Sequence, residues 1–234
     1  MKAIFKRELH AYFTGPIAYI FCAIYLLVTN LCFYYMNLQE YNSNTTTIFL
    51  VAVITLIILM PLMTMRLWSE EKRQRTDQLL LTAPVSTTQI VVGKFLASLA
   101  VFVVAVILTL VQPIIVVAHG TPQVGMLVGN YVALFFVGCA FIAISIFFSS
   151  LTKSQLVSAL CSILALALFL LMDLFAPMIQ ISWIANMLTF LSIVSRYANL
   201  LAGVFSLSDI FYFISLTVLF LFLTSRVIEK QRWS

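Results

Sequence analysis

Charged side chains are scarce in this sequence. Asp, Glu, Lys and Arg together make up 9% of the 234 residues, whereas hydrophobic residues make up 63% and the mean hydropathy is +1.10. Soluble domains carry roughly a quarter charged residues, so this chain has too few polar side chains to cover a surface that faces water. It also lacks a long polar stretch that would form a separate soluble domain. We therefore expect a single domain, residues 1–234, that lies in a lipid bilayer.

Motifs for catalysis, metal binding and ATP binding are missing as well. The sequence contains no G-x-S-x-G, no H-E-x-x-H and no phosphate-binding G-x-x-x-x-G-K-[ST]. Its two histidines, His10 and His119, fall on opposite predicted sides of the membrane and cannot share a metal ion. The four cysteines lie in apolar runs, without metal or redox spacing, and we interpret them as small buried side chains: Cys22, Cys32, Cys139 and Cys161. We expect this chain to be no enzyme and to bind no cofactor.

Six apolar runs are long enough to cross a bilayer as helices. They cover residues 16–36, 47–65, 95–118, 129–151, 156–175 and 210–225. Pro16 occupies a first turn, where its missing N–H does no harm, and Pro61 predicts a kink near the end of the second span. The predicted fold class is an all-α, polytopic membrane protein with six transmembrane helices.

The basic residues gather on one side of this arrangement. With alternating spans, twelve of the thirteen Lys and Arg residues fall on the face that carries both termini and residues 66–94, and only Arg196 falls on the other. Since cytoplasmic loops are enriched in Lys and Arg, we expect that face in the cytoplasm and residues 37–46 and 119–125 outside. The net charge of +5 forms no continuous basic face, so we expect no nucleic-acid partner.

Two segments are too polar or too interrupted to span the membrane. Residues 1–15 form an amphipathic pattern, with Lys2, Lys6, Arg7 and His10 largely opposite the apolar side chains, which predicts a helix lying in the membrane interface. A signal peptide is the alternative, but the apolar run that follows is too long and ends without a cleavage site. Residues 178–207 are moderately apolar, but polar residues and a glycine interrupt them. We predict short outer re-entrant or interfacial helices there, before the last span.

The one long charged segment, residues 66–94, contains an apolar group at Leu79–Leu81. Residues 86–89 have the pattern of a capping box that opens the third spanning helix, and Pro84 ends any helix before it. We predict a short cytoplasmic helix around Thr76–Thr82 that presents its leucines to a partner. The alternative is an ordinary inside loop whose leucines dip into the membrane.

Five short groups of residues follow one another in this segment. They are Ser69-Glu70-Glu71-Lys72, Thr76-Asp77, Leu79-Leu80-Leu81, Pro84-Val85-Ser86 and Gly93-Lys94. Their order and spacing resemble S-E-E-K-x-x-G-T-x-E-L-L-x-x-x-P-V-S, followed by Gly-Lys, in the permease subunits of ABC-2 type transporters. The chain is similar above all to the small gliding-motility and nitrous-oxide-cluster permeases. Arg75 replaces the family's glycine and Asp77 its glutamate, which puts the local turn geometry in question.

The resemblance implies a type V ABC exporter fold, with a coupling helix inside residues 66–94 that docks on a separate ABC ATPase subunit. The residues that it implies for this contact are Glu70, Glu71, Thr76, Asp77, Leu79, Leu80 and Leu81. ATP and Mg²⁺ would be bound by that ATPase, and a second copy of the permease would complete a transporter in a bacterial plasma membrane. Because the spans are rich in Phe, Met and Leu, we favour hydrophobic or amphipathic peptides over lipid-linked sugars or drugs as cargo.

The residues alone do not exclude two other classes of function. An ATP-independent channel or secondary carrier would predict inverted repeats or mid-membrane charges, and neither is visible. A membrane-embedded lipid-modifying enzyme needs convergent polar groups, for which Asp173, Arg196 and Asp209 are the outer candidates. We predict instead that Arg196 pairs with Asp173 or Asp209 in an outer gate. The alternative is that Arg196 only extends to the lipid headgroups.

Overall fold

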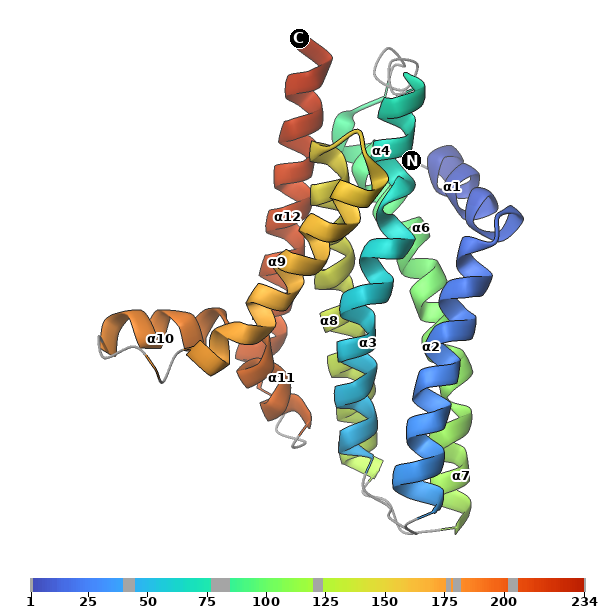
Figure 1. Ribbon diagram of the computed structural model, residues 1–234, viewed down its shortest axis with the longest axis vertical. Coiled ribbons are helices and arrows are strands. Elements are labelled where there is room, and N and C mark those ends of the chain that lie inside the picture. The colour runs from blue at the N-terminus through green and yellow to red at the C-terminus, as the bar shows by residue number, and fades with distance from the viewer. Residues whose placement is uncertain are drawn as a thin grey trace.

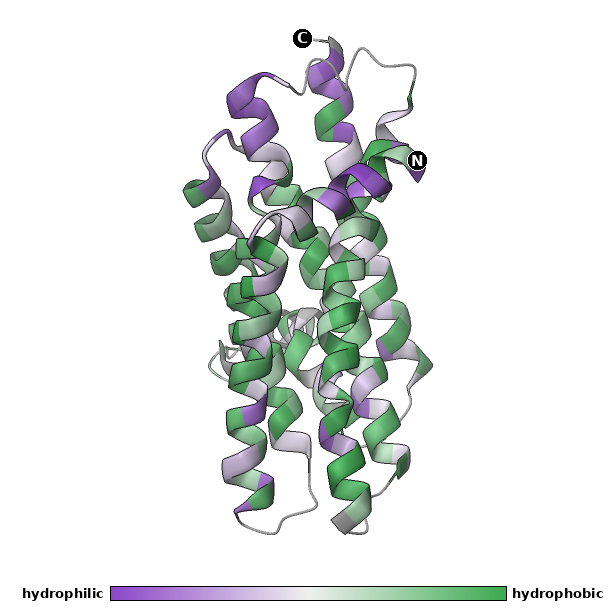
Figure 2. Ribbon diagram, turned by 90° about the vertical axis from the view of Figure 1, so that its right-hand side faces the viewer, coloured by the Kyte–Doolittle hydropathy of each residue, from purple (hydrophilic) through white to green (hydrophobic). Residues whose placement is uncertain are grey.

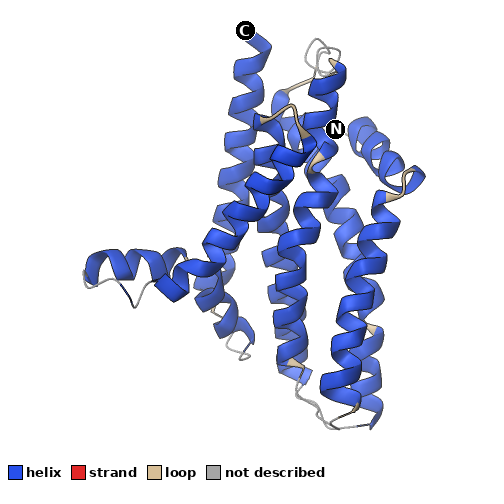
Figure 3. Ribbon diagram, viewed as in Figure 1, coloured by secondary structure: helices blue, strands red, loops and turns tan. Residues whose placement is uncertain are grey.

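A computed structural model of the chain describes residues 2–39, 45–76, 85–119, 124–175, 178, 182–201 and 206–233. Within these ranges the chain is helical, with short turns and no strand (Figure 3). The elements are α1 (Lys2–Thr14), α2 (Ile17–Phe33), a π-helical turn (Tyr34–Leu38), α3 (Thr46–Thr64), α4 (Arg66–Gln74), α6 (Thr87–Thr109), α7 (Val111–His119), α8 (Val124–Leu151), α9 (Gln155–Phe175), α10 (Ser182–Leu191), α11 (Ile193–Leu201) and α12 (Leu207–Trp233).

Six helices in the described part are long and apolar enough to cross a membrane. They are Ile17–Leu38, Thr46–Gln74, Thr87–Ala118, Val124–Leu151, Gln155–Asp173 and Leu207–Arg232. In Figure 1 they run side by side along the long axis of the molecule, and both termini lie near one end. Hydrophilic residues gather at that same end (Figure 2). The predicted all-α fold with six spanning helices is therefore confirmed.

α8 is the central helix of the bundle. Its most apolar stretch is 72% buried, against 22% for each of the last two spans. Close packing against α6 depends on Gly138, because a Cβ atom there would lie 2.2 Å from Cε1 of the Phe102 ring. Lipid tails are as apolar as the side chains of the helices, so the hydrophobic effect does not drive spanning helices together. Small residues that let two helices approach closely are therefore favoured where they pack.

The second span is longer than the sequence predicts. We expected it to end at Met65, but the helix continues beyond a single turn residue as α4, which ends at Gln74. Arg75 ends α4 in the left-handed conformation, with φ at 58°, and Thr76 N–H donates to the Glu71 carbonyl over 3.0 Å. Glycine adopts this backbone most readily, and glycine is what the ABC-2 pattern carries here. The turn is thus kept although arginine replaces glycine.

Apart from Thr76, the predicted helix around Thr76–Thr82 lies outside the described residues, since 77–84 are not described. The short helix that the structure contains is α4, upstream of the predicted position. After the gap, Ser86 caps α6 as expected, since its Oγ accepts the Gln89 N–H over 3.3 Å. The third spanning helix begins at this cap and not at the predicted Phe95. Ser86 satisfies a free N–H of the first turn, so the helix starts there, ahead of its apolar run.

Pro113 bends the third span near its far end. A proline has no N–H, so the carbonyl four residues earlier, that of Thr109, loses its helical partner. The helix changes from α6 to α7 at Leu110, and the Tyr131 hydroxyl of α8 donates to the Thr109 carbonyl over 3.1 Å. A neighbouring span thus satisfies the backbone group that the proline exposes, as backbone in a bilayer requires.

The two segments that cannot span are also helical. α1 packs on the start of α6, which fits the expected N-terminal amphipathic helix, and Figure 1 shows it at an angle to the bundle. α10 and α11 occupy the predicted region before the last span. In the same view α10 projects away from the bundle, whereas α11 packs against α8 and α9.

Candidate functional site

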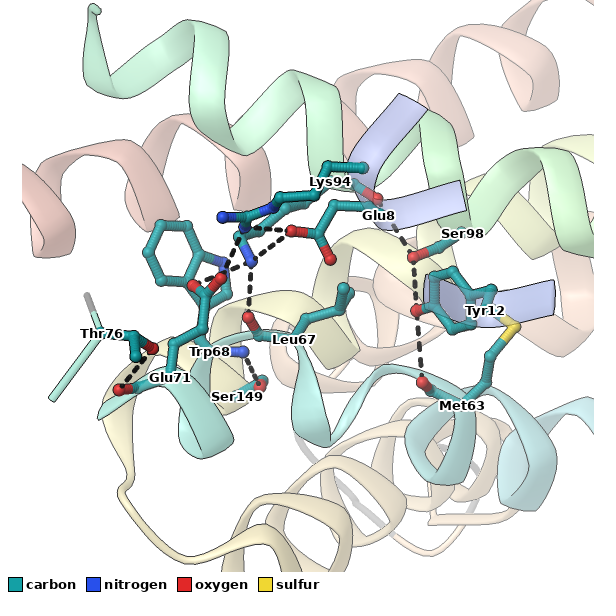
Figure 4. Close-up of polar contacts among 11 residues, drawn as sticks. Glu8, Tyr12, Met63, Leu67, Trp68, Glu71, Thr76, Lys94, Ser98 and Ser149 are labelled. Atoms are coloured by element: carbon teal, nitrogen blue, oxygen red, sulfur yellow. Dashed lines mark hydrogen bonds and ion pairs between the residues drawn. The ribbon is translucent and has the colours of Figure 1, made fainter. Parts of the chain in front are cut away.

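Four charged side chains from three helices meet at the hydrophilic end of the bundle (Figure 4). α1 contributes Arg7 and Glu8, α4 contributes Glu71, and α6 contributes Lys94. Arg7 Nη2 lies 2.7 Å from Glu71 Oε1 and also contacts Glu8. Lys94 Nζ lies 3.2 Å from Glu8 Oε1 and 2.9 Å from Glu71 Oε2. We call these four residues the charge cluster.

Lys94 is the centre of the charge cluster, and its side chain is 0% exposed. Besides the two carboxylates, its ammonium group donates to the Leu67 carbonyl over 2.7 Å and lies 4.8 Å from the centroid of the Trp68 ring. A buried lysine without such partners would lose its charge or destabilise the fold. Here two carboxylates, one carbonyl and one aromatic face replace its water. Lys94 therefore ties α6 to both α1 and α4.

The ionisation of the α1 charges reflects the same contacts. Burial by itself raises the pKa of the Glu8 carboxyl, but Lys94 and Arg7 outweigh burial and hold that pKa below its usual range. Burial likewise opposes the charge on Arg7, yet Glu8 and Glu71 raise the pKa of the guanidinium. The folded protein thus favours the charged form of both groups.

Tyr12 and Arg66 add hydrogen bonds to backbone carbonyls beside the charge cluster. The Tyr12 hydroxyl donates to the Met63 carbonyl of α3 over 3.2 Å and lies 3.1 Å from Ser98 Oγ of α6. Arg66, the first residue of α4, donates to the Ala11 carbonyl of α1 over 3.1 Å. The junction between α3 and α4 is therefore also bound to α1.

The opposite side of α4 is fixed to the end of α8. The backbone N–H of Trp68 donates to Ser149 Oγ over 3.3 Å, and the Ser149 hydroxyl donates to the Met65 carbonyl over 2.8 Å. Lys72 donates to the Ser150 carbonyl, which places a positive charge at the C-terminal end of α8, where the helix dipole favours it. α4 thus contacts α1, α6 and α8 through polar groups and continues α3 directly.

A polar groove of about 580 Å³ opens between α1 and α4. Arg7 and Arg66 line one part of it, and Glu70, Gln74 and Thr76 line another. Glu70 and Gln74 belong to α4, and Thr76 follows the residue that ends it. The groove therefore presents side chains of both charges together with neutral polar ones.

The predicted contact residues fall into three groups. Glu70 is half-buried and accepts a hydrogen bond from Gln74 over 3.2 Å, and Thr76 is exposed. Glu71 points inward and belongs to the charge cluster. Asp77, Leu79, Leu80 and Leu81 lie outside the described residues, so their contact with a partner stays a prediction.

The sequence analysis gave no role to Glu8 or Trp68 and named Lys94 only as part of the Gly-Lys group, although Glu8 carries a signal. It follows Phe5 by three residues and precedes Tyr12 by four, so helical periodicity places it on the apolar face of α1. An acid on an apolar face needs a basic partner. The identity of that partner, 86 residues later in the sequence, could not be read from α1 alone.

The outer candidates lie away from the charge cluster. Arg196 of α11 and Asp209 of α12 form an ion pair, with 2.8 Å between Nη1 and Oδ1. Asp173 is half-buried near the end of α9. No group of three His, Cys, Asp or Glu side chains that could hold a metal ion occurs among the residues that the structure describes.

Comparison with protein families places the chain among transport proteins. A family model described as ABC-2 family transporter protein matches residues 9–229. The match begins inside α1 and ends inside α12, so it includes the α4 region, the first five spanning helices and most of the sixth. No curated protein matches the chain.

Proposed function

The chain belongs to the ABC-2 family of transporter proteins, and we propose that it is the membrane subunit of an ATP-driven exporter. Two copies would pair in the membrane, and each would bind one ATPase subunit at the end that carries both termini. ATP and Mg²⁺ would be bound by those partner subunits, because this sequence contains no phosphate-binding loop. This chain would then do no covalent chemistry and would transmit motion.

The attachment of α4 is the observation that carries the proposal. α4 continues the second span beyond its apolar part and is bound to α1, α6 and α8 by charged and neutral hydrogen bonds. A partner that moved residues 75–86 would therefore displace four helices together. Rigid elements joined in this way are suited to bistable, rigid-body changes.

We propose two different roles for the predicted docking residues. Glu70 and Thr76 line the groove beside α1, and with Asp77, Leu79, Leu80 and Leu81 they form the surface that we propose for ATPase docking. Apolar anchors carry most of the energy of such interfaces, and rim charges adjust their register. Glu71 instead faces Arg7 and Lys94, so we assign it to holding α4 in place.

The orientation and the cargo belong to the proposal as well. Hydrophilic residues gather at the end with both termini, which supports placing that end in the cytoplasm of a bacterial cell (Figure 2). An apolar groove of about 450 Å³, lined by residues such as Ile114 of α7 and Val128 of α8, supports cargo with apolar surface. We favour hydrophobic or amphipathic peptides.

Co-purification tests the proposal. The chain with Leu79→Asp and Leu80→Asp should lose its ATPase subunit during purification from native membranes, because two charges would replace the apolar anchors. A variant with Lys230→Asp and Arg232→Asp is the control, since it adds two acidic side chains at exposed positions of the same end. The co-purified protein is identified as the ATPase by a phosphate-binding loop in its sequence, and its molar ratio to this chain is measured.

Three outcomes are informative. Loss of the ATPase only from the leucine variant supports docking at this segment. Equal retention by all variants would place docking elsewhere on the chain. Absence of any ATPase from the unmodified protein would contradict the exporter and favour an ATP-independent carrier or a membrane-embedded enzyme.

A further inference from the structure

The Arg196 guanidinium joins three helices at the end of the bundle away from the charge cluster. It extends from α11, forms the ion pair with Asp209 in the first turn of α12, and lies 4.8 Å from the ring centroid of Phe190 in α10. The guanidinium also lies 5.8 Å from the ring centroid of Tyr212 in α12. The rings of Phe190 and Tyr212 meet edge to face, with 6.4 Å between their centroids. One basic side chain is thus enclosed by an acid and two aromatic rings.

Burial makes this ion pair different from an ordinary surface pair. The Asp209 side chain is 1% exposed and the Arg196 side chain 19%. The pair between Arg226 and Glu229, on the same helix α12, is 62% and 45% exposed. Water screens the Arg226 pair but reaches the Arg196 pair much less.

α11 has a second attachment on another side. The Tyr197 hydroxyl, next to Arg196 in the sequence, donates to the Phe49 carbonyl of α3 over 3.2 Å, and Tyr197 is buried. α11 therefore bridges the second and the last spanning helices. Among the residues that the structure describes, its polar contacts with α3 include this neutral hydrogen bond, and those with α12 include the ion pair beside the aromatic rings. α11 also packs against α8 and α9.

A buried ion pair contributes little net stability compared with apolar side chains of the same size, but loss of one partner is costly. Such a pair is suited to selecting one arrangement of two helices over another. We propose that Arg196 and Asp209 form a latch, supported by Phe190 and Tyr212, that holds α11 against α12 and keeps the outer end of the bundle closed. When the pair separates, α11 moves away from α12 about its attachment at Tyr197.

This inference deepens the proposed function and rests on it, since a latch at the outer end matters to a transporter whose path opens there. Its test requires neither the ATPase nor the cargo. Failure of the latch would leave ATPase docking untouched, and failure of docking would leave the latch untouched.

Thiol accessibility of Ser192→Cys measures the state of the latch. Ser192 is fully buried at the corner between α10 and α11, one helical turn before Arg196, and cysteine has nearly its size. The four native cysteines are first replaced by alanine, and the purified chain is reconstituted in lipid nanodiscs. The rate of reaction with a water-soluble maleimide then reports how often this corner opens.

Four variants are compared in this background. Arg196→Glu and Asp209→Arg should each raise the labelling rate at least about tenfold, because each leaves like charges facing one another in a buried site. The double variant restores the pair in reverse order and should return the rate to within about threefold of the starting chain. Arg226→Glu, which breaks the exposed pair of the same helix, should leave the rate unchanged.

The outcomes either support or overturn the latch. Fast labelling in both single variants with rescue in the double variant supports it. Unchanged rates in the single variants, or fast labelling in the double variant, would overturn it. If a single variant does not elute as a folded monodisperse species, Asp209→Asn and Arg196→Gln, which remove charge without reversing it, are measured instead. Both must then label faster than the starting chain, or the latch is wrong.

Discussion

The two ends of this bundle use buried charges in different ways. At the end with both termini, four charges from α1, α4 and α6 share their partners, and Lys94 is completely buried among them. At the other end, one arginine of α11 meets one aspartate of α12, with aromatic rings beside the arginine. In the charge cluster each charge has two partners of opposite sign, so the loss of one contact leaves each charge with another. Loss of the contact between Arg196 and Asp209 instead removes the ion pair that joins α11 to α12.

This difference fits the tasks that we propose for the two ends. α4 has to carry force from a partner to several helices without yielding, so redundant contacts are an advantage there. α11 has to release and close again, so one contact with two discrete states is enough. The comparison can be tested by removing one charge at each end and measuring the cost.

The largest effect is expected from Lys94→Ala. It leaves Glu8 and Glu71 near one another with Arg7 as their remaining partner, and it empties a fully buried site. Breaking a buried pair in this way costs about 3–5 kcal/mol. The free energy of unfolding in mixed detergent micelles measures the loss, with Arg226→Ala as a control that should cost at most about 1 kcal/mol. Equal losses in the two variants would show that the charge cluster does not act as a network.

A smaller effect is expected from Asp209→Asn. The amide keeps the size of the side chain and can still accept one hydrogen bond from Arg196, so the variant loses only the charge of the acceptor. Hydrogen bonds to charged groups contribute about 1.5–3 kcal/mol, and the same micelle assay measures the difference. A loss as large as that of Lys94→Ala would remove the contrast between the two ends.

The smallest effect is expected from acid. Because the pKa of Glu8 is lowered below its ordinary value of 4.5 in the folded protein, the unfolded chain binds more protons as the pH falls through this range. The stabilisation by Glu8 is thus complete above pH 4.5 and is lost as the pH falls through the lowered pKa. The free energy of unfolding should decrease less steeply with falling pH in Glu8→Gln than in the starting chain. Parallel curves would show that Glu8 titrates no differently in the two states.

Hydropathy and local chemistry predicted much of the fold. Six apolar runs correspond to six spanning helices, and Ser86 caps α6 at the predicted place. The end of the second span at Met65 was predicted wrongly, because α4 is polar and its helix is stabilised by contacts with α1 and α8. Hydropathy marks where the bilayer ends and carries no information on whether the helix ends there.

The candidate site was predicted only in part. The charged segment after the second span was identified, but Glu71 was assigned to a partner surface, and the structure places it against Arg7 and Lys94. For Arg196 the sequence offered Asp173 and Asp209, and the structure pairs it with Asp209. Nothing in the local sequence distinguishes these acids, since each lies near the end of an apolar helix.

The sequence by itself determined that this protein lies in a lipid bilayer, how many times it spans the bilayer and that its charges gather at one end. These follow from the free energy of transferring each side chain into lipid, which depends on residue type and on short windows of sequence. Only the tertiary structure decided which charges meet. Glu71 and Arg7 are 64 residues apart, and Lys94 and Glu8 are 86 apart. A buried charge requires a partner within a few ångströms. The packing of α1 on α6, and of α4 and α6 on α8, brings those partners together.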